Sequence, residues 1–157
     1  MFNMQHHYHT EIRWTGNKGS GTSSYTDYER SHDLIISNKP TLSMSSDTPF
    51  RGDGSKQNPE DLLLASLSSC HMLWYLHLCA DAGVIVLDYC DKASAIMETG
   101  NDKPGHFVEV VLRPQVTVQS EAMVESAMRL HAKAHEQCFI ANSVNFPVHR
   151  EPEILIR

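Results

Sequence analysis

Four cysteines, at positions 70, 79, 90 and 138, are the side chains of this 157-residue chain best suited to covalent chemistry. No two of them stand at the spacing of a redox Cys-x-x-Cys motif or a zinc ribbon, and four are too few for a disulfide scaffold. A core thiol is the ordinary alternative, because cysteine is among the most buried residue types. We interpret Cys79 and Cys90 as structural and expect any disulfide in the chain to be catalytic.

A thiol served by a histidine would indicate a cysteine hydrolase or acyltransferase. The histidines available to Cys70 as a base are His71, His77, His131 and His135. His71 is poorly placed for this role, because adjacent residues on a helix diverge by about 100°. His131 and His135, one helical turn apart, could also bind zinc together with a cysteine, although any solvated helix face shows the same spacing.

The segment that carries Cys70 has the end signals of a long helix. Asn58 is a favoured N-cap, Pro59 suits the first helical position, and Glu60 places negative charge at the positive end of the helix dipole. Gly83 is well suited to end the helix. Apolar residues occur on nearly every side of it, so we expect this helix to be buried at the centre of the fold.

Strands are predicted on both sides of this helix. The runs that predict them are His9–Trp14, Leu34–Ile36 and Thr41–Ser45 before the helix, and Val84–Cys90, Ala93–Met97 and Phe107–Val118 after it, the last interrupted near Pro114. We expect the runs after the helix to form a second antiparallel unit. Residues 47–57 combine Pro, Gly and polar side chains without a period, which is typical of a loop, and functional residues often lie on loops.

A second helix is predicted from Ser120. Its apolar positions, at 123, 127, 130, 134 and 138, recur at spacings of four, three, four and four, which is one face of a helix. Glu153–Arg157 can then form a closing edge strand. The order β-α-β-α-β, without repeated crossover units, predicts an α+β fold in a single domain over residues 1–157, and not a doubly wound sheet.

Composition excludes several other classes of protein. A formal net charge of -6, without a dense Lys/Arg run, argues against nucleic acid or anionic lipid as a partner. The long helix contains serine and histidine and is bracketed by aspartates, so we expect it not to span a membrane. The N-terminus shows no secretory signal, which favours a cytoplasmic protein. His6, His7 and His9 lie on no rigid element, so we expect neither a metal nor a cofactor.

The run Asn58-Pro59-Glu60-Asp61-Leu62-Leu63, followed by small and apolar residues into Cys70-His71-Met72, resembles the central helix of the OsmC/Ohr family. These are the osmotically inducible and organic-hydroperoxide-resistance peroxidases. The resemblance extends to Cys138 near the end of the next helix and to the order of elements, and is closer to the OsmC branch. It implies an intertwined homodimer, in which antiparallel sheets wrap two central helices and two active sites lie at the subunit interface.

The resemblance also implies an activity, thiol-dependent reduction of peroxides, preferably organic ones. It assigns Cys70 as the peroxidatic cysteine, Cys138 as the resolving cysteine, and Glu60 as the glutamate of the site. For the arginine of the site we expect Arg51, nine residues before Glu60, with Arg30 or Arg13 as the alternative from the earlier hairpin. One departure from the family pattern is that Phe139-Ile140 follows Cys138, where many members have a proline.

The chemistry gives a physical reason for the arginine. A thiolate must attack the peroxide, yet a free thiol with a pKa near 8.5 is mostly protonated at pH 7. Cys70 lies about twelve residues into its helix, beyond the reach of the helix dipole, so a cation must stabilise the thiolate. Glu60 would hold the guanidinium in a bidentate pair. Ten residues of helix separate Glu60 from Cys70 by roughly 15 Å, so we expect each site to combine both subunits.

The oxidised Cys70 is expected to form a disulfide with Cys138, which an external dithiol must reopen. By resemblance this reductant is a lipoyl group on a protein. Two other functions stay open at this point. One is the cysteine acyl-transfer enzyme described above. The other is a non-catalytic dimeric module that binds a hydrophobic ligand in an interface pocket, with Cys70 as a passive thiol.

Overall fold

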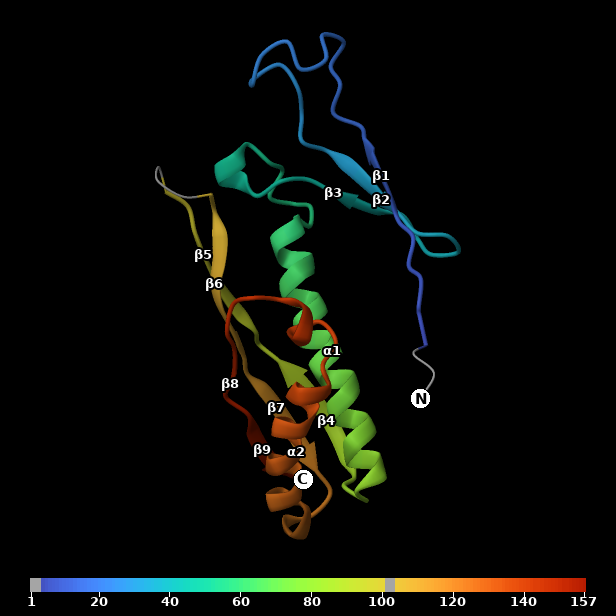
Figure 1. Cartoon of the computed structure of the whole chain (residues 1–157), viewed down its shortest axis with the longest axis vertical. Helices are drawn as coiled ribbons and strands as arrows, with labels where there is room; N and C mark the ends of the chain where they lie inside the picture. Colours follow the sequence, from blue (N-terminus) through green and yellow to red (C-terminus); the bar gives the residue numbers. More distant parts are fainter. Residues whose placement is uncertain (1–3, 101–103) are drawn as a thin grey trace. The chain divides into compact units, whose positions relative to one another are not determined.

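The computed structural model describes residues 4–100 and 104–157 (Figure 1). The contacts between residues divide the chain into two units, Met1–Leu62 and Leu63–Arg157. Helices and strands follow one another in the order β-α-β-α-β, which confirms the predicted α+β class. The single domain predicted over residues 1–157 stays a prediction.

The first unit contains a three-stranded antiparallel sheet. Its strands are β1 (Glu11–Trp14), β2 (His32–Ile35) and β3 (Leu42–Met44), and the short 3-10 helix η1 (Thr48–Phe50) follows them. All three strands lie where the sequence predicted them, although β2 begins two residues earlier than the apolar run. The loop predicted at residues 47–57 is confirmed, apart from the single turn of η1.

The second unit contains two three-stranded sheets, ordered β4-β7-β9 and β5-β6-β8. The strands are β4 (Val86–Asp91), β5 (Ser94–Glu98), β6 (His106–Leu112), β7 (Pro114–Val118), β8 (Val148–Arg150) and β9 (Glu153–Ile156). The predicted break at Pro114 is confirmed, since it separates β6 from β7. The closing edge strand is confirmed as β9, whereas β8 was not predicted, because three residues after a proline give too short a signal.

The antiparallel unit predicted from the runs after the central helix is confirmed, and the two C-terminal strands add parallel partners to it. β4 pairs with β7 and β5 with β6 in antiparallel register, but β6 pairs with β8 and β7 with β9 in parallel. Parallel neighbours need a long connection between them, and here α2 (Val124–Gln137) supplies it. The helix turns the chain back, so that β8 and β9 run in the same direction as β6 and β7.

The central helix α1 (Pro59–Asp81) has the ends that the sequence predicted. Asn58 Oδ1 accepts a hydrogen bond from the backbone N–H of Asp61 at 2.8 Å, which satisfies one free donor of the first turn. At the other end Gly83 has a φ of 71°, and the N–H of Val84 donates to the carbonyl of Cys79 at 2.9 Å. This Schellman arrangement needs the left-handed conformation that glycine adopts without strain.

Within one chain α1 buries a single stripe, not all of its sides. The buried residues are Leu67, His71, Tyr75 and Cys79, each four positions after the last. Leu73, on another side of the helix, is 63% exposed. The prediction of a helix buried all round is therefore wrong for the single chain. By length and apolar composition α1 would also pass as a membrane span, a test that core helices pass too.

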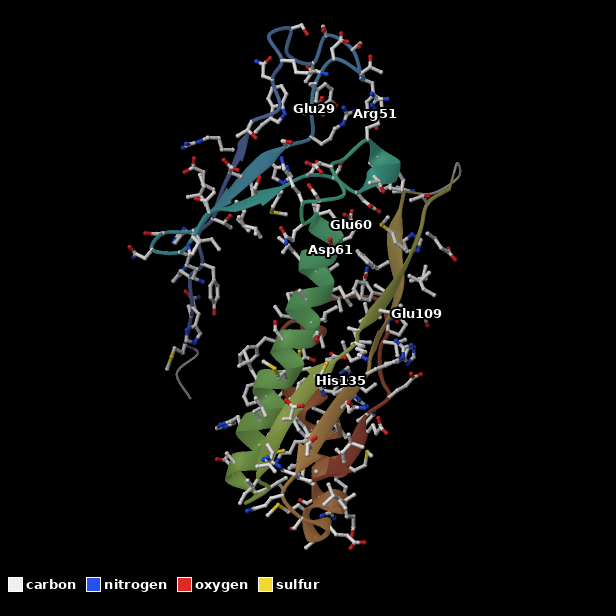
Figure 2. All side chains as sticks on the ribbon, turned by 180° about the vertical axis from the view of Figure 1, so that it is seen from behind. Glu29, Arg51, Glu60, Asp61, Glu109 and His135 are labelled. Carbon is white, nitrogen blue, oxygen red and sulfur yellow. The ribbon has the colours of Figure 1, made fainter. Side chains whose placement is uncertain are left out.

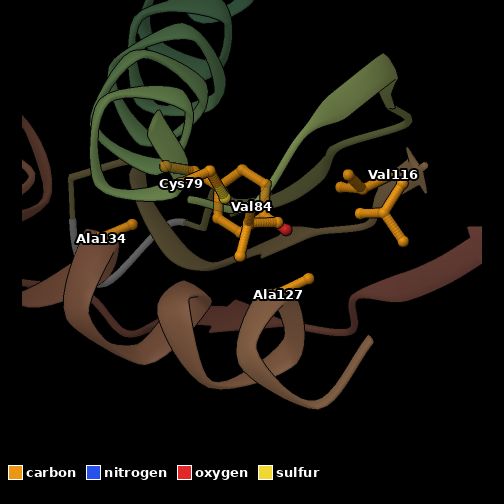
Figure 3. Packing of buried hydrophobic residues seen from close by; sticks show 7 residues of the cluster. Cys79, Val84, Val116, Ala127 and Ala134 are labelled. Carbon is orange, nitrogen blue, oxygen red and sulfur yellow. The ribbon is translucent and has the colours of Figure 1, made fainter. Parts of the chain in front are cut away.

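The stripe of α1 packs on α2 and on the β4-β7-β9 sheet (Figure 3). Ala127 and Ala134 of α2 are fully buried against Tyr75 and Cys79, together with Val116 of β7. The predicted inward face of the second helix is thus confirmed, although α2 proper begins at Val124, after the 3-10 turn η2 (Glu121–Met123).

Two histidines lie inside this core. His71 of α1 is 0% exposed and His131 of α2 is 2% exposed, and Nε2 of His71 lies 3.0 Å from Nδ1 of His131. The His131 ring also stacks on Tyr75, with ring centroids 3.9 Å apart. Burial, and after it the positive charge of Arg150, lowers the pKa of His71 to about 4. Burial, and after it His71, lowers the pKa of His131 to about 3, so both rings are neutral at pH 7.

This burial predicts a loss of stability in mild acid. The unfolded chain takes up protons on both histidines below pH 6.5, whereas the folded chain does so only near pH 4 and pH 3. The free energy of unfolding should therefore fall as the pH decreases from 6.5 to about 4, by about 1.4 kcal/mol for each pH unit and each histidine. Denaturant titrations between pH 7 and pH 4.5 measure this slope.

A matched control is available on β6. His106 is exposed, so His106→Gln should leave the slope unchanged, whereas His131→Phe should remove about half of it. A wild-type free energy of unfolding that stays constant between pH 6.5 and pH 4.5 would contradict the prediction.

Candidate functional site

The thiols of Cys70 and Cys138 meet between α1 and the end of α2. Cys70 is half-buried, about three turns into α1, and Cys138 is the first residue after α2, with a relative exposure of 1%. The Cys70 thiol is close enough to Cys138 to raise the pKa of that thiol, and all four cysteines of the chain are free. The predicted pair of cysteines is therefore adjacent within a single chain.

The surroundings of the two thiols differ in a way that separates their roles. Burial, followed by the hydrogen bond with Cys70, raises the pKa of Cys138 to about 11. Cys138 is thus a protonated thiol at neutral pH and a poor nucleophile. Because Cys70 is the more exposed of the two, it is the thiol that a molecule from solvent can reach first.

Local structure after α2 holds Cys138 in place. Its backbone leaves the helix in an extended conformation, with φ of −67° and ψ of 109°, and its N–H still donates to the carbonyl of His135 at 3.2 Å. The N–H of Ala141, at the start of η3 (Ala141–Ser143), donates to the Cys138 sulfur at 3.5 Å. The N–H of Asn142 donates to the Cys138 carbonyl at 3.0 Å. The Cys138 sulfur is thus fixed from both sides along the chain.

An aromatic pair borders the two thiols. Trp74, one turn after Cys70, meets the ring of Phe139, the residue after Cys138, in an edge-to-face contact with centroids 5.3 Å apart. Phe139 is nevertheless 67% exposed. Phe139, which stands where many family members have a proline, thus contacts α1 directly after the end of α2. Next to it, Leu73, Trp74 and His77 line a shallow apolar depression on α1.

Glu60 and Arg51 belong to the first unit (Figure 2). Glu60 is half-buried in the first turn of α1, and Arg51 is exposed, with a φ of 65°, at the end of η1. Among the residues that the structure describes, Glu60 forms no ion pair within 4 Å, with Arg51 or any other cation. The bidentate pair expected between them stays a prediction, and α1 runs without a break between Glu60 and Cys70.

Arg30 and Arg51 differ in how far their guanidinium groups are already engaged. Arg30 donates to the carbonyls of Tyr28 at 2.6 Å and of Tyr25 at 2.7 Å, and its guanidinium lies over both of these rings. The Arg51 guanidinium lies 5.9 Å from the Tyr25 ring and donates no hydrogen bond to the described residues. The N–H donors of Arg51 are thus the ones available to a further group.

The remaining cysteines occupy different environments. Cys79 is buried in the core, where burial raises the pKa of its thiol, in keeping with the structural role predicted for it. Cys90 is exposed on β4, beside Lys92 and Arg113. Cys90 therefore lies on the surface of the sheet and not in the core, unlike what a structural role would lead one to expect.

Three of the four histidines that the sequence offered as bases for Cys70 have other side chains as neighbours. The hydrogen bond of His71 goes to His131, and His77 faces Asp81 at 3.5 Å. Within residues 4–100 and 104–157, no group of three or more His, Cys, Asp or Glu side chains could hold a metal ion. His131 is thus a core residue hydrogen-bonded to another helix, which its spacing from His135 did not reveal.

Arg150 is a residue that the sequence analysis did not consider. It lies on β8, and its charge is felt by the rings of His71, His131 and His135. A predicted strand at residues 148–150 would have drawn attention to Arg150, but three residues are too few to predict a strand.

Comparisons with known proteins agree with this fold. The family model of OsmC-like proteins matches residues 52–153. The structure of an OsmC-like protein of unknown function from Vibrio cholerae is 29% identical, with a TM-score of 0.81, over 94% of this chain and 99% of that one. An organic hydroperoxide resistance protein OsmC, a predicted redox protein from Legionella pneumophila, has a TM-score of 0.69 at 17% identity, over 98% and 99%. At that identity the likeness concerns the fold.

A search with the sequence finds a relative that is itself uncharacterized. It is the protein YmaD of Bacillus subtilis, 23% identical over 158 residues, which are 97% of this chain and 95% of that protein. The family model spans well over half of the chain and includes Glu60, Cys70 and Cys138, whereas Arg51 falls one residue before it. The chain therefore belongs to the family of OsmC-like proteins.

Proposed function

We propose that this protein is a thiol peroxidase that reduces organic hydroperoxides. The observation that carries the proposal is the proximity of a half-buried Cys70 to a buried, protonated Cys138 at the positions of the family motif. Two free thiols that lie near each other can form a disulfide once their Cβ atoms are about 3.5–4.5 Å apart. Relatives named as hydroperoxide resistance and redox proteins support the same class of chemistry.

In the first step, the Cys70 thiolate attacks the terminal oxygen of the hydroperoxide. The O–O bond breaks, an OH group is transferred to sulfur, and the alkoxide leaves and takes up a proton to become the alcohol. The sulfur is oxidised by two electrons and the peroxide is reduced by two. Cys138 does not compete for the peroxide, because its thiol is buried and protonated.

In the second step, Cys138 resolves the sulfenic acid. Its sulfur attacks the Cys70 sulfur, the S–O bond breaks, and the hydroxide leaves with the proton of Cys138 as water. An external dithiol then reopens the disulfide by two exchange reactions and becomes a disulfide itself. We propose a protein-bound lipoyl group as this reductant, following the family resemblance.

The active unit that we propose is a homodimer. The single chain leaves Leu73 of α1 63% exposed and Phe139, next to Cys138, 67% exposed, which is a high exposure for large apolar side chains beside a reactive thiol. A second copy of the chain would cover them. It would also bring its own Glu60 and Arg51 toward Cys70, where the guanidinium would stabilise the thiolate.

Substitution of the two cysteines tests the reaction. Cys70→Ser should abolish reduction of an organic hydroperoxide. Cys138→Ser should allow one turnover and leave a sulfenic acid on Cys70, because no thiol remains beside it to form the disulfide. Intact mass and disulfide mapping after one equivalent of cumene hydroperoxide measure both outcomes.

Cys90→Ser is the matched control, since Cys90 is an exposed thiol outside the pair. It should leave the rate unchanged. If wild-type protein loses no thiols at low-micromolar organic hydroperoxide, the proposed function is wrong. Thiol acylation during ester turnover would instead favour the acyl-transfer enzyme.

Arg51→Ala should slow the reaction of Cys70 with hydroperoxide by about tenfold or more and move its pH-rate profile to higher pH. The reason is that a cation favours the thiolate over the thiol, at about 1.4 kcal/mol for each pH unit. Arg51→Lys keeps the charge and should lose less. Stopped-flow rates between pH 5 and pH 9 give the profile. Should Arg30→Ala produce the shift and Arg51→Ala leave it in place, Arg30 is the arginine of the site.

Leu73→Glu should weaken the dimer, because it places a charge in the apolar surface that we expect a second copy to cover. Sedimentation velocity over a range of concentrations measures the change. Lys133→Glu, at an exposed position of α2, introduces the same side chain as a control. A wild-type chain that sediments as a monomer at all concentrations would contradict the proposed dimer.

A further inference from the structure

The buried pair His71 and His131 lies beside the two thiols, and the proposed reaction does not use it. His71 directly follows Cys70 on α1, and His131 precedes Cys138 by seven residues, which is about two turns of helix. Nε2 of His71 lies 3.0 Å from Nδ1 of His131, and both rings are almost completely buried. This hydrogen bond is therefore a direct tie between the two helices that carry the cysteines.

A pair of buried histidines is a costly way to connect two helices. Each neutral imidazole has one N–H, so their mutual hydrogen bond leaves one donor and one acceptor over. The outer atoms, Nδ1 of His71 and Nε2 of His131, are buried and have no hydrogen-bond partner among the described residues. Buried polar atoms without partners cost stability, and two apolar side chains would avoid that cost. What a directional hydrogen bond adds is a single relative position of the two helices.

That position matters for the thiols. A disulfide forms only when the two Cβ atoms are about 3.5–4.5 Å apart, so small displacements of one helix along the other prevent it. Cys138 directly follows α2 in extended backbone, so the position of α2 determines the position of Cys138. The His71–His131 hydrogen bond fixes α2 two turns before Cys138, and Trp74 with Phe139 fixes the chain just after it.

We propose that the His71–His131 hydrogen bond is a positioning element that holds Cys138 opposite Cys70 and so governs how readily their disulfide forms. His131 acts through Cys138 and touches no substrate. The catalytic role of this disulfide rests on the proposed function, whereas the positioning role of the histidines does not. The proximity of the thiols can be measured without any peroxide.

The measurement is the equilibrium between dithiol and disulfide in glutathione redox buffers, made on the full chain in a Cys90→Ser background. The ratio of the two forms gives the effective concentration of one thiol at the other. His131→Phe keeps an aromatic ring against Tyr75 but removes the hydrogen bond, and should lower the effective concentration at least tenfold. His131→Asn places an amide atom where Nδ1 stood, and should stay within about threefold of wild type.

Further variants separate positioning from general damage to the fold. His71→Leu removes the other partner and should cause a loss like that of His131→Phe, while the double variant should show little additional loss. His149→Phe, an exposed histidine on β8, is the matched control and should have no effect. The rate at which iodoacetamide alkylates Cys70 should be the same in all variants, because Cys70 stays where it is on α1.

An unchanged effective concentration in both His131→Phe and His71→Leu would overturn the inference. An equal loss in His131→Asn and His131→Phe would overturn it too, since the hydrogen bond would then not be the cause. If wild-type protein forms the Cys70–Cys138 disulfide in glutathione buffer but does not react with hydroperoxide, the proposed function fails while the positioning role stands.

Discussion

The core that α1 and α2 share with the β4-β7-β9 sheet is the constraint on which the second unit depends. Tyr75 and Cys79 of the buried stripe of α1 share one core cluster with Ala127 and Ala134 of α2, whereas Leu67 packs in a second cluster with Val110 and Leu112 of β6. The buried thiol of Cys138, just after α2, lies near the half-buried thiol of Cys70 on α1. The sheets cover the remaining sides of the same core.

The two thiols differ in burial, and this difference suits them to different steps of the proposed reaction. Both are cysteines on apolar segments, but the low polarity around Cys138 keeps it protonated, whereas Cys70 retains access to solvent. A buried thiol beside an accessible one is protected from over-oxidation until its partner has reacted. In the proposed reaction, this difference in exposure sets the order in which the two thiols react.

Local signals explain most of what the sequence predicted. The ends of α1 were predictable because Asn58 and Gly83 act within a few residues, and Cys70 and Cys138 were identified from a motif and an element order. The one-sided burial of α1, the parallel pairing of β8 and the His71–His131 contact were not predictable, because each depends on which distant segment becomes a neighbour. The spacing of His131 and His135 looked like a solvated face for the same reason.

The late addition of β8 and β9 has a consequence for how the chain is made. β6 and β7 each gain their second neighbour only from residues 148–156, which follow every other element in the order of synthesis. Until that segment emerges, both strands present open backbone hydrogen-bonding edges, the kind of surface on which chains join to one another. The interval between the synthesis of α2 and that of β9 is therefore the period in which a nascent chain is most exposed to aggregation.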